Sequence, residues 1–353
     1  MRDLSAPPTH VGATTIDHVL TAWYHQVLRS EMNTVTARLT FYIISILLCF
    51  GRVWAEGIHH YVFFNRDRER ISEASFLQAK FEGAQLKYSW RELEPQKDRY
   101  HFEDIQKDLA FLQSKGKKLF IQIQDASFDI NIRPFPRYLL EDPAYHGGAD
   151  KQYGDGDVAY GWMARRWDKA VQERFQRLLL AVGSEFDGKV QGINLAETAF
   201  DTASTERLSP KGFTPEAYCD AIITNMRVLK QAFPRSVTLQ YANFMPGGQR
   251  YLERVYERAK ELKVGLGGPD LLPYKPGQMQ NSYPLLQQYA GVVPTGIAVQ
   301  DGNYEHRNPK TGQQVTIPEL LSFATEYLKV DYIFWCTQEP FYSQKVIPFI
   351  GHR

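Results

Sequence analysis

The sequence predicts an α/β protein in which eight parallel strands, alternating with helices, close into a single-domain (β/α)₈ TIM barrel. Short apolar runs alternate with amphipathic stretches, which is the pattern of repeated βα units. The chain of 353 residues is 43% hydrophobic, so it can bury a large core. A barrel of this type takes ~250 residues. No composition break or Pro/Ser-rich linker divides residues 56–353, and we therefore expect one domain there.

Residues 1–55 are predicted to be an export segment and not part of the barrel. An apolar run at residues 41–50 precedes Val53-Trp54-Ala55, which ends in a small residue. The run is shorter than the about 20 residues of a transmembrane helix. Its order is typical of a secretory signal peptide cleaved after Ala55; a single N-terminal membrane anchor is the alternative. Because Met32 is a suitable start for the signal, we expect residues 1–31 to come from an upstream start codon.

The charge and cysteine content exclude several classes of protein. Lys and Arg number 41 against 40 Asp and Glu, for a net charge of +1. This balance provides no global field for nucleic-acid phosphates or an anionic membrane. The three cysteines of the chain cannot form a disulfide framework. We expect a secreted or periplasmic protein with no nucleic-acid partner and no stable membrane insertion after signal cleavage.

Eight strands are predicted from short apolar runs bounded by turn residues. They lie at residues 60–64, 83–88, 118–124, 190–195, 237–241, 264–267, 296–300 and 331–335. Between the third and fourth strands, residues 125–168 are rich in Gly, Tyr, Asp and Arg. A long polar and aromatic βα loop belongs on the catalytic face of such a barrel.

The segments between these strands carry helix signals. Ile105, Leu109 and Leu112 recur at a spacing that lines one helical face, and Gly116 stands where a C-terminal cap is expected. Thr214 precedes a proline, which indicates an N-terminal cap followed by a first helical turn. Apolar spacing indicates two further helices near residues 251–262 and 320–328.

One part of the sequence resembles a known group of enzymes. Residues 81–95 read FEGAQLKYSWRELEP, and Tyr100-His101-Phe102 follows. This segment resembles the second βα unit of clan A glycoside hydrolases, nearest to the bacterial β-galactosidase-type members. The third strand and Pro136-Arg137-Tyr138-Leu139 resemble the next unit of these enzymes. The resemblance is clear over residues 81–140, moderate over 190–200, and limited to topology in the C-terminal third.

Glu197 is the predicted general acid/base. It follows the fourth predicted strand, in the order Asn194-Leu195-Ala196-Glu197-Thr198, and barrel enzymes place their chemistry at the carboxyl ends of strands. The resemblance implies the same role, since clan A enzymes carry their acid/base Glu at this point. Those enzymes normally have Asn directly before it, where this chain has Ala196. The alternative is a capping or ion-paired carboxylate at the start of a loop.

Glycoside hydrolysis requires a second carboxylate, which attacks the sugar or activates water. The resemblance implies a Glu at the end of the seventh strand, where this chain has Gln300 and Asp301. Asp301 is the nearest acid, although Asp-Gly is also a common turn. Glu339, beyond the eighth strand, is the rival for this role, and a plain loop carboxylate is the alternative for it.

Other polar and aromatic side chains at predicted strand ends form the candidate cleft. They are Tyr88, Trp90, Gln124, Asp125, Asn194, Tyr241, Asn243, Asp270, Gln300, Trp335 and Gln338. The resemblance implies that Trp335 stacks on a sugar, and a core aromatic is the alternative. Few basic residues occur in this set, so it suits a neutral, hydroxylated ligand held by hydrogen bonds and stacking.

The sequence contains no G-x-G-x-x-G after a strand, no P-loop and no His-Glu-x-x-His. We therefore expect no cofactor and no metal. The predicted function is an exported glycoside hydrolase that acts on an oligo- or polysaccharide by two-carboxylate catalysis. The alternative is a carbohydrate-binding pseudoenzyme that has lost the seventh-strand nucleophile. A third, weaker hypothesis is an inactive barrel that scaffolds polysaccharide assembly.

Overall fold

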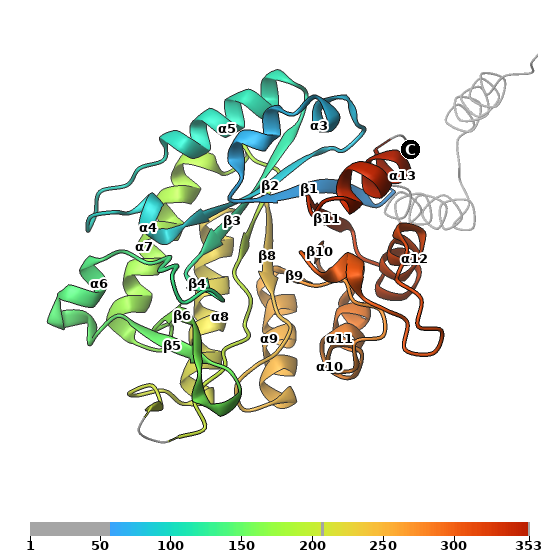
Figure 1. Ribbon diagram of the computed structural model, residues 1–353. Coiled ribbons are helices and arrows are strands. Elements are labelled where there is room, and N and C mark those ends of the chain that lie inside the picture. The colour runs from blue at the N-terminus through green and yellow to red at the C-terminus, as the bar shows by residue number, and fades with distance from the viewer. Residues whose placement is uncertain (1–56, 206–207, 352–353) are drawn as a thin grey trace, which may run out of the picture. The chain divides into compact units, whose positions relative to one another are not determined.

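The computed structural model of the protein describes residues 57–205 and 208–351. The predicted signal peptide at residues 1–55 lies outside these residues. From Ile58 onward the chain forms one unit, in which eight parallel strands close into a barrel (Figure 1). The predicted single-domain (β/α)₈ barrel is confirmed.

The barrel strands follow one another around the barrel in chain order, and β11 closes it against β1. They are β1 (His59–Asn65), β2 (Gly83–Ser89), β3 (Lys118–Gln124), β7 (Gly192–Leu195), β8 (Val237–Tyr241), β9 (Gly265–Gly268), β10 (Thr295–Val299) and β11 (Tyr332–Cys336). Each overlaps a predicted strand.

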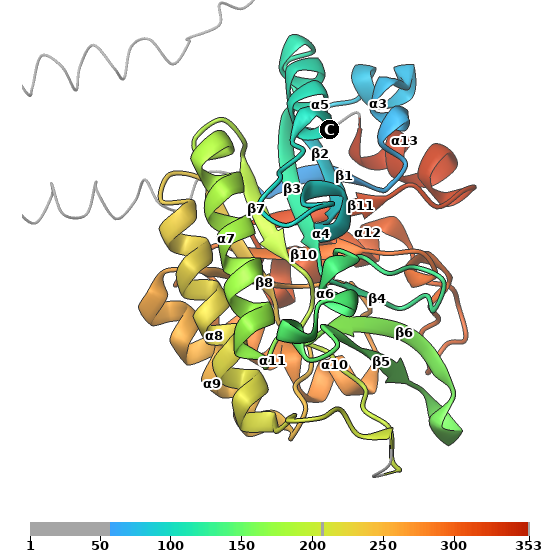
Figure 2. The ribbon, with the colours of Figure 1, turned by 90° about the vertical axis from the view of Figure 1, so that its left-hand side faces the viewer.

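Helices cover the outside of the barrel, and α7, α8 and α9 pack side by side there (Figure 2). The α-helices are α3 (Ala74–Gln78), α4 (Trp90–Leu93), α5 (Glu103–Ser114), α6 (Tyr138–Glu141), α7 (Lys169–Phe186), α8 (Pro215–Ala232), α9 (Gln249–Leu262), α10 (Pro276–Gln280), α11 (Ser282–Tyr289), α12 (Ile317–Ser322) and α13 (Ile347–Ile350). The 3₁₀ and π segments are η1 (Arg68–Ser72), η2 (Pro143–Tyr145), η3 (Asp155–Asp157), η5 (Asn303–Glu305), η6 (Phe323–Leu328) and η7 (Tyr342–Val346). Within the described ranges, no helix is both long and apolar enough to cross a membrane.

The predicted helix signals act as expected. Ile105, Leu109 and Leu112 are buried on one face of α5, and Gly116 adopts a positive φ of 68° just beyond its end. The Thr214 hydroxyl accepts a hydrogen bond from the Ala217 amide at 3.0 Å and so caps α8. These local caps satisfy amide and carbonyl groups that a helix end leaves unpaired.

An aromatic cluster fills the lower part of the barrel. The ring of Phe120 lies 5.8 Å from that of Tyr61 and 5.0 Å from that of Phe334, and both contacts are edge-on. Gly192 on the neighbouring strand makes room for it, because a β-carbon there would lie 2.4 Å from the Phe120 ring. The interior below the mouth is therefore a packed core, as in other barrels of this type.

The loop between the third and fourth barrel strands contains a small antiparallel sheet that the sequence did not predict. It is formed by β4 (Ala126–Ser127), β6 (Ala159–Ala164) and β5 (Ala149–Tyr153), in that order (Figure 2). The polar or glycine-containing sequences ADKQY and AYGWMA lack a clear apolar alternation. The sheet positions Tyr160 and the turn at η3 beside the loop that follows β7.

Candidate active site at the mouth of the barrel

Glu197 lies two residues beyond the end of β7, at the mouth of the barrel. The backbone around it is fixed on both sides. The Arg166 guanidinium donates to the Glu197 carbonyl at 2.8 Å, and the Thr198 amide donates to the Tyr241 carbonyl at 3.0 Å. The side chain is partly buried, so its carboxyl group has limited contact with solvent.

The surroundings of Glu197 favour its protonated form. The pKa of the Glu197 carboxyl is raised to about 7, and burial is the main cause. The negative charge of Asp270 contributes to this rise, whereas a hydrogen bond from Asn243 Nδ2 to Oε2 at 2.6 Å opposes it, as do the positive charges of Lys87 and Arg166. A carboxyl group with a pKa near neutrality can donate a proton and accept it back.

If Glu197 acts as a general acid, this arrangement predicts how the pH dependence of activity responds to substitution of Asn243. Asn243→Ala removes a donor that stabilises the carboxylate, so the pKa of Glu197 rises. Since a general acid must be protonated, kcat/KM falls as the pH rises through that pKa, and the alkaline limb of the variant should lie at higher pH than that of the wild type. Asn308→Ala is the control, because the Asn308 side chain bonds within its own turn to Lys310. A limb that stays in place, or moves to lower pH, contradicts the assignment.

Asp125, predicted to bind substrate, is instead committed to a buried ion pair. Its carboxylate accepts two hydrogen bonds from Arg166, from Nε at 2.7 Å and from a terminal nitrogen at 2.6 Å. The side chains are 3% and 5% exposed respectively. Arg166 also donates to the Tyr218 hydroxyl at 2.8 Å. The pair therefore connects the end of β3 to the Glu197 backbone and positions the candidate acid.

Asn194 and Tyr241 lie in the barrel interior below the mouth. Gln85 Nε2 donates to Asn194 Oδ1 and to the Tyr241 hydroxyl, each at 2.9 Å. All three residues are buried. They form a polar layer between the aromatic cluster and the mouth.

Three predicted cleft aromatics do not reach the mouth. Tyr88 donates to Asp108 of α5 at 2.7 Å. Trp90 donates to Glu94 at 2.8 Å. Trp335, which is 0% exposed, donates to His60 at 3.1 Å. Because successive strand residues point to opposite faces, Tyr88 and Trp335 lie on the outer faces of their strands, next to the interior Lys87 and Phe334. The structure therefore corrects the predicted stacking role of Trp335.

The predicted carboxylates differ in their surroundings. Asp301 is exposed, just beyond β10, and its charge acts on Lys87. Glu339 is also exposed, and it accepts hydrogen bonds from the Ser343 amide at 3.2 Å and the Ser343 hydroxyl at 2.6 Å. Glu339 is thus engaged in a local cap at the start of η7.

Asp270 follows β9 and is held by the next loop. Asn303 Nδ2 donates to Asp270 Oδ1 at 3.0 Å, and Asn303 Oδ1 accepts from the Gln300 amide at 3.1 Å. Burial raises the pKa of Asp270, and its charge acts on Glu197. Asp270 was predicted as a binding residue, and these contacts make it a second candidate for the facing carboxylate.

The predicted glutamines form hydrogen bonds with residues of the loops around the mouth. Gln124 accepts a hydrogen bond from Arg66. Gln338 accepts from the Gly302 amide at 2.9 Å and donates to Glu305 at 2.7 Å. Gln338 therefore fixes the loop that carries Asp301. Gln300 is partly buried, and its backbone bonds to Asn303: its amide donates to Asn303 Oδ1 at 3.1 Å, and its carbonyl accepts from the Asn303 amide at 3.0 Å.

An aromatic pair that the sequence analysis did not select lies beside this site. Phe128, which is 46% exposed, stacks on Tyr160 with ring centres 6.0 Å apart and planes 13° apart. The Tyr160 hydroxyl donates to Asp201 at 2.6 Å. Burial, the Asp201 contact and the charge of Glu197 all raise the pKa of Tyr160. An exposed aromatic face near the candidate acid suits the apolar face of a sugar ring.

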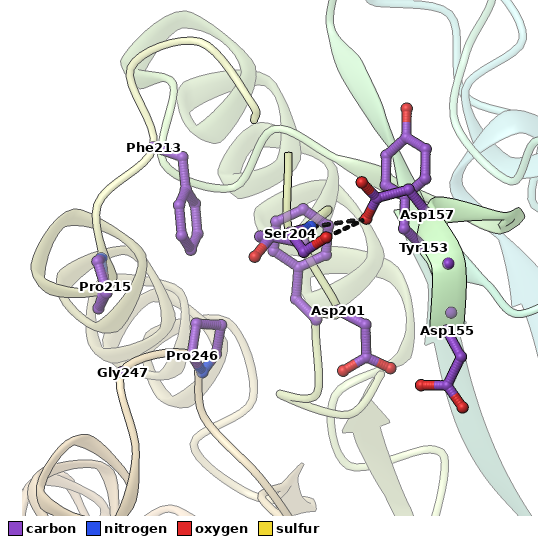
Figure 3. A pocket seen from close by; sticks show the side chains of 13 residues that line it. Tyr153, Asp155, Asp157, Asp201, Ser204, Phe213, Pro215, Pro246 and Gly247 are labelled. Atoms are coloured by element: carbon purple, nitrogen blue, oxygen red, sulfur yellow. Dashed lines mark hydrogen bonds between the residues drawn. The ribbon is translucent and has the colours of Figure 1, made fainter. Parts of the chain in front are cut away.

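Asp201, the partner of Tyr160, is one of the residues that line a pocket of about 600 Å³ (Figure 3). It lies between η3, the loop after β7 and the start of α8. Its lining residues include Tyr153, Asp155, Asp157, Phe200, Asp201 and Phe213. Asp157 fixes the far wall by accepting hydrogen bonds from the Ser204 amide at 2.7 Å and hydroxyl at 3.0 Å (Figure 3). None of the predicted site residues lines this pocket. Over the residues that the structure describes, no group of three or more His, Cys, Asp or Glu is placed to hold a metal ion.

Comparison with known proteins supports the fold. No model of a known protein family matches the sequence, and no curated protein matches it. Among solved structures, the chain is similar to the catalytic domain of a β-amylase from Paenibacillus polymyxa, with a TM-score of 0.56 and 11% identity, over 79% of this chain and 92% of that one. β-Galactosidases from Halorubrum lacusprofundi and Bacillus circulans sp. alkalophilus give TM-scores of 0.52 and 0.53 at 12% and 8% identity. These matches cover 79% and 80% of this chain but only 52% and 50% of the β-galactosidases. These similarities concern the fold: the chain forms a (β/α)₈ barrel like those of these solved glycosidases.

Proposed function

We propose that this protein is a glycoside hydrolase in which Glu197 protonates the glycosidic oxygen of an oligo- or polysaccharide. The observation that carries the proposal is the partly buried Glu197 carboxyl at the barrel mouth, with a pKa of about 7 and an oriented hydrogen bond from Asn243. At neutral pH such a group is present in both protonation states, as acid/base catalysis requires. The similarity of the barrel to those of glycosidases supports the fold on which this chemistry depends.

In the proposed reaction the proton of Glu197 passes to the oxygen that leaves, and the bond from this oxygen to the anomeric carbon breaks. A second carboxylate either attacks that carbon, with later hydrolysis of the ester, or removes a proton from the attacking water. We assign this role to Asp301. It follows the seventh barrel strand, and its charge, like that of Glu197, raises the pKa of Lys87.

The Asp301→Asn and Asp270→Asn variants test whether Asp301 or Asp270 is the second catalytic carboxylate. Asp301→Asn should lose activity by roughly 10²–10⁴-fold. Asp270→Asn should retain turnover, and its alkaline limb should move to lower pH, because removal of the Asp270 charge lowers the pKa of Glu197. The measurement is kcat/KM against pH on one glycan, with azide added to the Asp301→Ala variant to replace a lost nucleophile. The reverse pattern, with Asp270→Asn inactive and Asp301→Asn active, would transfer the role to Asp270.

The second candidate function is a carbohydrate-binding barrel without turnover. It is favoured by one observation: Gln300 and the exposed Asp301 occupy the place where the family resemblance implies a Glu. Glycan binding by the wild-type protein with no release of reducing ends would support this candidate over hydrolysis.

We also propose that the protein is exported and acts outside the cytoplasm. The support is the apolar run at residues 41–50 with the small Ala55 beyond it. The N-terminal sequence of the protein recovered from its native host should begin at Glu56. A mature protein that retains the apolar run would instead favour the membrane anchor.

A further inference from the structure

Two cationic side chains, Lys87 and Arg66, lie at the mouth although the sequence predicted few basic groups there. Gln85 of β2 bonds inside the barrel to Asn194 and Tyr241. Because side chains alternate along a strand, Lys87 lies on the same inner face, one layer nearer the mouth. Its ammonium group is 4.9 Å from the centre of the Phe63 ring, on the adjacent strand β1.

Lys87 lacks the partners that a buried ammonium group normally has. It is partly buried, and in the described part of the chain it makes no ion pair and no hydrogen bond. The pKa of Lys87 is lowered to about 8, chiefly by burial and also by the positive charge of Arg66. The charges of Glu197 and Asp301 oppose this shift without removing it. An ammonium group has three donors, and all three are left for a ligand.

Arg66 follows β1, where Asn65 pairs with Leu86 of β2, and its charge lowers the pKa of the neighbouring Lys87. Its guanidinium group donates to the amide oxygen of Gln124 and forms no ion pair among the described residues. Burial lowers the pKa of Arg66, while the charges of Glu92 and Asp129 raise it. Two neighbouring strands therefore bring two like charges together at the mouth, and neither is paired with a carboxylate.

Such an arrangement is unfavourable in the free protein and favourable around an anion. A cation removed from water without a partner costs free energy, and a like charge nearby adds to that cost. A bound anion neutralises both charges and accepts charge-assisted hydrogen bonds, which are about twice as strong as neutral ones. We propose that Lys87 and Arg66 bind the carboxylate of a uronic acid residue, so that the substrate is an acidic glycan.

A neutral sugar explains the same geometry less well. Its hydroxyl groups could accept hydrogen bonds from Lys87, but they would leave both positive charges unneutralised. The nearby carboxylates do not serve as counterions, since neither Glu197 nor Asp301 forms an ion pair with Lys87. With its pKa near 7, Glu197 is moreover only partly ionised at neutral pH. This inference rests on the proposed function for the location of the site, but carboxylate binding does not depend on turnover.

The test compares each acidic glycan with its carboxyl-reduced counterpart, which has the same linkage but CH₂OH in place of the carboxylate. Oligomers of glucuronic, galacturonic and mannuronic acid are titrated calorimetrically into the Glu197→Gln variant, so that no turnover occurs. For at least one sugar, the acidic form should bind about 10- to 100-fold more tightly than the reduced form. The preference should weaken as salt is added.

Variants at the two cations locate the effect. Lys87→Met and Arg66→Gln, each made in the Glu197→Gln background, should bring the ratio of the two affinities close to one, while Lys87→Arg should keep most of the preference. Lys118→Met is the matched control, because Lys118 lies at the opposite end of the barrel and pairs with Glu82 at 3.1 Å. If Lys87→Met does not fold, Lys87→Gln and the salt dependence of the parent protein replace it.

Three results overturn the proposal: no preference for any acidic form, a preference that Lys87→Met leaves intact, or tight binding of a sulfated hexose with no preference for uronates. Results that contradict glycoside hydrolysis can be distinguished from results that contradict the anion site. A protein that prefers uronates but releases no reducing ends from them lacks the activity and retains the anion site. A protein that hydrolyses only the carboxyl-reduced glycans and does not bind the acidic forms more tightly has the proposed activity but lacks the anion site.

Discussion

Glu197→Gln should lower kcat/KM by roughly 10²–10⁴-fold on a natural glycan. The amide has nearly the shape of the carboxyl group but cannot donate a proton to the leaving oxygen at neutral pH. The loss should be much smaller on a dinitrophenyl glycoside, because this leaving group departs as a stable anion without protonation. A rate assay with both substrates checks this difference.

Glu339→Gln is the matched control for this prediction. It makes the same chemical change at an exposed carboxylate that bonds to Ser343. Its kcat/KM should stay within about twofold of the wild type. An equal loss for Glu197→Gln on both substrates would contradict general acid catalysis, and a large loss in Glu339→Gln would transfer a catalytic role to Glu339.

The second large effect concerns stability. Asp125→Asn should lower the free energy of unfolding by about 3–5 kcal/mol, because it leaves the buried Arg166 guanidinium without its counterion. Urea denaturation followed by circular dichroism measures this change. Asp150→Asn is the matched control, since the Asp150–Arg165 pair is more exposed and its loss should cost less.

A double variant separates the stability of this pair from its positioning role. Asp125→Leu with Arg166→Met removes both charges together, and it should recover much of the stability lost by the single variant. It should not recover activity, because Arg166 also holds the Glu197 carbonyl. A double variant that is both stable and fully active would contradict the positioning role of Arg166.

The barrel could be predicted because its signals are local. Most strands are short apolar runs, and α7 and α8 begin at residues whose side chains cap the first turn, Asp168 and Thr214. The antiparallel sheet inside the loop after β3 could not be predicted in the same way. Its strands include polar side chains and glycine, and their pairing depends on contacts that form only once the barrel exists.

The candidate site was only partly predictable. The sequence does not show to which face of the barrel a strand side chain points, or which residues distant in sequence become its partners. The position of Glu197 after the fourth strand identified it, and Asn243 was selected by the same criterion. Strand-end position alone also selected Tyr88, whereas the alternation of β2 directs Lys87 to the mouth. The sequence shows that neighbouring residues of β2 point to opposite faces, but it does not show which face is inward. The hydrogen bond from Gln85 to Asn194 inside the barrel identifies the inward face.

The misassignment of Asp125 has a different cause. A polar residue directly after a strand looks the same in sequence whether it faces a ligand or a buried partner. Its partner Arg166 is 41 residues away and is brought to it by the small sheet that the sequence did not reveal. The role of Asp125 therefore depends on tertiary structure, as does the approach of Asp270 to Glu197.

The most direct test of the proposed role of Glu197 measures binding and turnover on the same glycans, with the wild-type protein and the Glu197→Gln variant side by side. If Glu197 is the general acid, both proteins bind one glycan with similar affinity and only the wild type releases reducing ends from it. Binding by both proteins with release by neither would contradict hydrolysis and favour the carbohydrate-binding barrel. Equal release by both would contradict the role of Glu197.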